Sequence, residues 1–150
     1  VQGMRPLMSY NYGAKLKERM HQILKVSGLV IAAILGAGTL LFFIVPNVLL
    51  SLFNASSGML EIGKTGLRIL SLSFIVSSFG VLMSGVFEAL GLGKYSLIVS
   101  LLRQLLITVP LAYILLNIMG IEGIWLSFVI AEAIASIVAY ILYRKKFKTI

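Results

Sequence analysis

The sequence has no cysteine, a single histidine and only five acidic residues. The missing cysteines exclude disulfides and thiolate metal sites, and a lone histidine makes neither a metal site nor a proton relay. Charged residues make up 12% of the 150 positions, whereas hydrophobic residues make up 59%. A soluble domain of this size needs polar residues over about half of its surface. The composition therefore predicts a membrane protein.

Long uncharged runs are what the chain has in quantity. A helix needs about 20 apolar residues to cross a hydrocarbon core of about 30 Å. We predict an all-α, polytopic fold with spans over residues 24–46, 64–90, 95–118 and 122–143, after a polar segment over residues 1–21. The first span carries Gly28, Ala32 and Gly36 at four-residue steps, which predicts a close helix neighbour. Pro110 predicts a kink near the middle of the third span.

The net charge of +8 would suggest nucleic acid if the charges formed a stripe. Instead, the basic residues gather before the first span, at Lys94, and after the fourth span from Arg144 to Lys146. This is the positive-inside pattern of membrane proteins. We expect a multi-pass protein of the cell membrane, with its basic loops and C-terminus in the cytoplasm, the lipid bilayer as a partner and no nucleic acid bound.

A polar stripe runs along the second span. Ser73, Ser77, Gly80, Ser84 and Glu88 lie three or four residues apart and therefore share one helix face. A helix that faces lipid alone has no use for such a stripe. We expect this face to meet other protein or water, and we interpret Glu88 as an ion-pair partner of Lys94 or Arg103.

Glu132 lies near the middle of the fourth span, at helical spacing from Ser136 and Tyr140. A carboxylate at the centre of a spanning helix costs roughly 2.5–3.5 kcal/mol on insertion scales, so something has to offset it. Two interpretations stay open: a protonatable residue in a cavity, or a packing acid bonded to a neighbour. For Arg103, snorkelling or pairing with Glu88 is favoured over substrate contact. The candidate pathway residues are Ser77, Ser84, Glu88, Arg103, Gln104, Glu132, Ser136 and Tyr140.

Two stretches resemble a known family. The segment GMRPLMSYNYGAK, residues 3–15, followed by Arg19, resembles the cytoplasmic segment that opens the C-terminal half of multidrug and toxic compound extrusion (MATE) transporters. The passage FEALGLGK, residues 87–94, with Arg103-Gln104 and Pro110-Leu111 beyond it, is similar to the family's tenth-to-eleventh helix passage. The resemblance implies helices nine to twelve of a six-helix C-terminal lobe, and we expect Val1 to lie inside a longer chain.

The resemblance also implies a function. It is that of a cation-coupled antiporter, driven by H⁺ or Na⁺, that exports drugs or toxic organic compounds by alternating access. It implies no enzyme activity, no cofactor and no metal site, and its partners are the remaining helices of the transporter and small cationic substrates. A lipid-linked oligosaccharide flippase of the same superfamily is an alternative, but its cavity should hold several cationic side chains and only Arg103 is deep enough. A non-transporting assembly module is another alternative, which the polar stripes disfavour.

Overall fold

A computed structural model describes residues 1–52 and 56–147, and every regular element within these ranges is helical. The elements are α1 (Met4–Gly13), α2 (Lys17–Ile44), α3 (Pro46–Ser51), α4 (Ser57–Ala89), α5 (Gly93–Leu101), the π-helical segment η1 (Leu102–Leu106), α6 (Thr108–Met119) and α7 (Ile121–Phe147). The predicted all-α class is confirmed.

Four helical stretches of the described chain are long and apolar enough to cross a membrane. They are Lys17–Ile44, Gly58–Ala89, Gly93–Met119 and Ile121–Lys146. The first of them begins seven residues before the predicted start at residue 24. The basic residues from Lys17 to Lys25 therefore form the first turns of a spanning helix and not a separate element.

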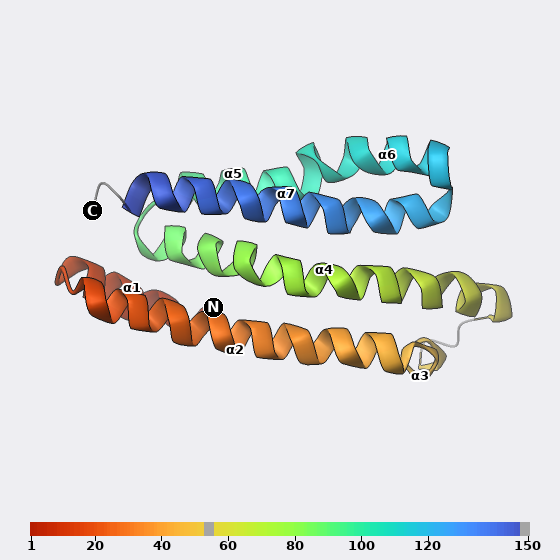
Figure 1. Ribbon diagram of the computed structural model, residues 1–150, viewed down its shortest axis with the longest axis horizontal. Helices are drawn as coiled ribbons and strands as arrows, with labels where there is room; N and C mark the ends of the chain where they lie inside the picture. The colour runs from red at the N-terminus through yellow and green to blue at the C-terminus, as the bar shows by residue number, and fades with distance from the viewer. Residues whose placement is uncertain (53–55, 148–150) are drawn as a thin grey trace.

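The long helices lie side by side, with α4 between α2 and α7 (Figure 1). The continuous α5–η1–α6 stretch packs against α7, and α5 also contacts α4. A larger share of α4 is buried than of the other three spanning stretches. The predicted polar stripe is on this central helix, where Ser73 and Gly80 are buried and Ser77 and Ser84 are half-buried.

The two ends of the bundle differ in charge. One end bears α1, the start of α2, the α4–α5 connection and the end of α7, on the left in Figure 1. We call it the basic end, because Lys15, Lys17, Lys94, Arg144 and Lys145 belong to these segments. The opposite end bears α3 and the α6–α7 connection.

Small residues of α7 are buried where it packs against its neighbours. Ser127, Ala131, Ala135 and Ala139, at four-residue steps, are at most 1% exposed. Glycines mark where α4 comes closest: a Cβ on Gly66 would lie 2.8 Å from Trp125 Cε2, and one on Gly80 would lie 3.2 Å from Ser136 Oγ. In a membrane, helices associate through such close contact, because burying apolar surface gains nothing over lipid.

The small-residue face predicted for the first span is mostly wrong. A Cβ on Gly28 would lie 3.2 Å from Leu82 of α4, but Ala32 is exposed and nothing lies within 4 Å of a Cβ on Gly36. Four-residue steps advance about 40° more than a full turn each time, so the row turns away from a neighbour that runs alongside. Further along α2, Thr39 holds α4 instead, by donating a hydrogen bond to the Ser71 carbonyl at 2.9 Å.

Methionines fill the core at the basic end. Met4 and Met8 of α1, Met20 of α2 and Met83 of α4 are at most 6% exposed and share one buried cluster with Phe87. Nearby, Ser9 Oγ donates to the Ala89 carbonyl at 2.6 Å. The short helix α1 is thereby fixed to the end of α4.

Enlarging a buried alanine of α7 should destabilise the protein. In Ala135→Leu, three added carbons enter a site that is 1% exposed, and such overpacking typically costs about 1–3 kcal/mol. Ile134→Leu, at a neighbouring position that is 39% exposed, is the control and should leave stability nearly unchanged. Thermal unfolding of the purified full-length protein in detergent checks this. Equal melting temperatures for the two variants would contradict the close packing of α7.

Candidate functional site

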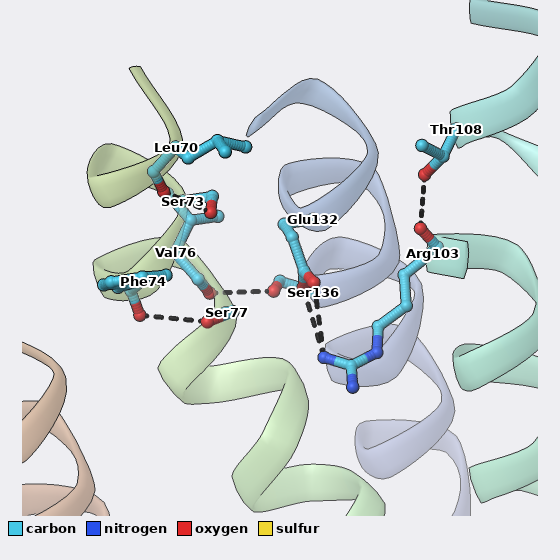
Figure 2. Close-up of polar contacts among 9 residues, drawn as sticks. All are labelled: Leu70, Ser73, Phe74, Val76, Ser77, Arg103, Thr108, Glu132 and Ser136. Carbon is cyan, nitrogen blue, oxygen red and sulfur yellow. Dashed lines mark hydrogen bonds and ion pairs between the residues drawn. The ribbon is translucent and has the colours of Figure 1, made fainter. Parts of the chain in front are cut away.

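An ion pair joins the third and fourth spanning stretches. Arg103 Nη1 lies 3.3 Å from Oε1 and 3.4 Å from Oε2 of Glu132, so one guanidinium nitrogen faces both carboxylate oxygens (Figure 2). The two side chains are 21% and 18% exposed. The guanidinium offsets part of the cost of holding a carboxylate among apolar helices. The pairing expected between Arg103 and Glu88 is therefore wrong.

The π-helical segment η1 carries Arg103 toward α7. Its wider turn is closed by a hydrogen bond from the Ile107 N–H to the Leu102 carbonyl, five residues back, at 3.0 Å. A π turn holds one residue more than an α turn, which offsets the faces of α5 and α6 by about 100°. The Thr108 hydroxyl donates to the Arg103 carbonyl and so satisfies a group that the irregular turn frees.

The irregularity lies before the proline that predicted it. Pro110 has no N–H, so the Leu106 carbonyl at the end of η1 loses its usual helical donor. The distortion expected near the middle of the span is present, as a π segment that begins eight residues before Pro110.

A layer of serine contacts joins α4 to α7 beside the ion pair. Ser136, one turn from Glu132, donates through Oγ to the Val76 carbonyl at 3.0 Å (Figure 2). The neighbouring Ser77 donates to the Phe74 carbonyl of its own helix at 3.0 Å. The structure thus brings together four of the predicted residues: Ser77, Arg103, Glu132 and Ser136.

Glu88 belongs to a separate cluster at the basic end. Its Oε2 lies 2.5 Å from Arg5 Nη2, and its Oε1 accepts a hydrogen bond from Ser96 Oγ at 2.8 Å. An ion pair was expected, but the predicted partners were wrong, because Lys94 lies over the Tyr95 ring and Arg103 reaches Glu132. The cluster ties α1 to the ends of α4 and α5.

The remaining three candidates do not join the ion pair. Ser84 is half-buried on α4, and Gln104 is exposed although it follows Arg103 directly. Tyr140 is 47% exposed, and its ring lies 6.0 Å from that of Phe79. Among the described residues, no three His, Asp or Glu side chains gather as ligands for a metal ion.

Sequence reasoning missed Arg5 and Ser96 as partners of Glu88 and did not pair Arg103 with Glu132. Arg5 lies 83 residues from Glu88, and no local spacing connects them. For the central pair a signal was available: each residue is a charge well inside an otherwise apolar span.

Comparisons with known proteins agree on one family. Residues 1–114 match the family model described as MatE. Over 141 residues, the chain is 26% identical to the multidrug export protein MepA of Staphylococcus saprophyticus, covering 94% of this chain and 31% of that protein. The chain thus spans about a third of the length of the relatives that it matches.

Solved structures show the same arrangement of helices. The MATE multidrug transporter DinF-BH, solved in complex with a drug, is 31% identical with a TM-score of 0.85, over 95% of this chain and 32% of that one. A MOP superfamily transporter from Pyrococcus furiosus, whose description reports a binding pocket of reverse polarity and suggests a different function, is 23% identical with a TM-score of 0.86. That match covers 97% of this chain and 33% of that one and shows the fold alone.

The ion pair should be measurable as a coupling between its two residues. In a double-mutant cycle with Arg103→Gln and Glu132→Gln, we expect an interaction energy of about 0.5–3 kcal/mol in the thermal unfolding of the purified protein, because each single change leaves a partly buried charge unpaired. The pair Arg5–Glu88, with side chains 39% and 36% exposed, is the control, with an expected coupling of about 0.2–1 kcal/mol. Purely additive effects at residues 103 and 132 would contradict the pairing.

Proposed function

The chain belongs to the MatE family of transporters, as its resemblance to MATE transporters predicted, and on this basis we propose that it contributes four spanning helices to a multidrug exporter. The proposed activity is antiport: inward movement of H⁺ or Na⁺ drives outward movement of drugs or toxic organic compounds. Access to the binding site alternates between the two faces of the membrane as the lobes of the transporter rock. The family is one of transporters and not of enzymes.

The observation that supports coupling is the half-buried carboxylate of Glu132 in the middle of α7. Ionisable residues inside spanning helices are costly and commonly belong to ion or substrate pathways. A carboxylate can hold a proton or attract a cationic substrate, and the two ligands weaken each other's binding at a shared carboxyl. Such competition is a coupling free energy between the two ligands, which is what antiport requires.

The substrates we propose are small organic cations. Two relatives support export of drugs: MepA is a multidrug export protein, and DinF-BH is a multidrug transporter solved with a bound drug. The carboxylate of Glu132 favours those drugs that carry a positive charge. The other partners are the bilayer and the remaining helices of the full-length transporter. Exposed apolar side chains along α2 suit either of these partners.

The flippase alternative is weaker on charge. Recognition of a lipid pyrophosphate needs several unpaired cationic groups, whereas Arg103 is already neutralised by Glu132. The likeness to a transporter of different function shows that the fold alone does not choose the substrate, so the charge of the site has to. The assembly-module alternative gives no role to a charged pair in the middle of two spans.

We place the basic end in the cytoplasm, because basic residues are retained on that side of the membrane. α1, the α4–α5 connection and the end of α7 then face inward, and α3 with the α6–α7 connection faces outward.

Glu132→Gln should abolish most of the transport. The change keeps the size of the side chain and fixes it in a neutral state, so we expect efflux of a cationic dye from cells to fall at least about tenfold at equal expression, which corresponds to about 1.4 kcal/mol. Glu88→Gln, which removes an acid from the exposed cluster at the basic end, is the matched control and should have a smaller effect. Normal pH-driven efflux by the Glu132→Gln protein would return this residue to a packing role.

The orientation can be tested with single cysteines, since the chain has none of its own. In a cysteine-free background of the full-length protein, cysteines at His21 and Lys146 should be inaccessible to an impermeant thiol reagent on intact cells. Cysteines at Gly58 and Glu122 should be labelled. Labelling from outside at Lys146 would reverse the proposed orientation.

A further inference from the structure

We infer that Arg103 is a specificity-determining residue for the coupling ion: it is a tethered cation that occupies the Glu132 carboxylate and makes the site respond to protons and not to sodium. This inference rests on the proposed antiport function and narrows its coupling ion. It starts from the geometry of the pair, in which one guanidinium nitrogen lies 3.3–3.4 Å from both carboxylate oxygens.

The charge at the site changes through Glu132 alone. Arginine side chains stay protonated in proteins, so Arg103 keeps its charge throughout. The site is neutral when Glu132 is ionised and carries one positive charge when Glu132 is protonated. A proton therefore expels a cationic substrate in two ways, by removing the carboxylate's charge and by leaving the guanidinium uncompensated.

Other charged groups on the packed elements are remote. On α4, Arg68 and Glu88 lie about 12 and 18 Å along the helix from Val76, which touches Ser136. Lys94 lies about 13 Å from Arg103 along the α5–η1 stretch. α6 contains no charged residue. On α7 itself, Glu122 and Arg144 lie about 15 and 18 Å from Glu132, and the titratable Tyr140 about 12 Å.

A sodium ion would meet two obstacles that a proton does not. Hard cations are held by several oxygen ligands, which include carboxylates, hydroxyls and backbone carbonyls. Here the Glu132 oxygens face a guanidinium, and the Ser136 hydroxyl already donates to the Val76 carbonyl. The carbonyls of the irregular turn are also used, since Leu102 accepts from the Ile107 N–H and Arg103 from Thr108. A proton needs one carboxylate lone pair and no new ligands.

The test uses the purified full-length transporter in proteoliposomes, with ethidium as the transported cation. We expect a pH gradient imposed in choline buffer to drive ethidium exchange, and a sodium gradient at equal pH to drive less than a tenth of that rate. Equal or faster exchange with the sodium gradient would overturn the inference, while loss of exchange in Glu132→Gln under the same gradient would still support the proposed function. Normal pH-driven exchange by Glu132→Gln would instead count against the proposed function itself.

Variants at Arg103 then test its role directly. Arg103→Gln frees the carboxylate, so sodium at constant ionic strength should raise the melting temperature of this variant above its value in choline, because a bound ligand stabilises the folded state. Arg103→Lys, which keeps a tethered cation, is the control, and it should show no sodium effect, as should the unmodified protein. A sodium-dependent rise in the unmodified protein, or its absence in a folded Arg103→Gln protein, would contradict the assignment.

Discussion

Helices in a bilayer gain little from hiding apolar surface, because lipid is as apolar as the helix, so α7 depends on close contact with its neighbours. Its buried serine and alanines, with Gly66 and Gly80 on α4, permit that approach. The same contact sets the level at which Ser136 meets the Val76 carbonyl. Glu132 lies one turn away on α7, so the packing of small residues also decides where the carboxylate lies relative to α4 and η1.

The second constraint is that every backbone polar group inside a membrane needs a partner. Pro110 removes a donor from the third spanning stretch, and the chain responds with the π turn of η1 and with the hydroxyl of Thr108 on the Arg103 carbonyl. The arginine is thus carried by an irregular turn whose polar groups are satisfied. The position of Arg103 and the accommodation of the proline are parts of one local arrangement.

Much of the fold was predictable because hydropathy alone marks residues that must be helical in a membrane. The spans, the polar face of α4 and a mid-span irregularity before Pro110 were all readable from spacing. Contacts between distant segments were not. The partner of Glu88 is Arg5, which depends on how α1 folds back, and the pairing of Arg103 with Glu132 depends on a π turn that shifts the helix face by one residue. Of the small residues on the first span, Gly28 alone meets α4 closely, because α2 and α4 follow a different register.

The buried methionines at the basic end give this bundle two kinds of seam. Glycine, alanine and serine on α4 and α7 have no side-chain length to rearrange, so a shift between those helices opens voids or produces clashes. Methionine is unbranched and flexible, and it refills irregular space at small cost. The seam that Met4, Met8, Met20 and Met83 form between α1, α2 and α4 is therefore deformable. Sliding at the basic end is accommodated there, while α4 and α7 travel as a single rigid unit.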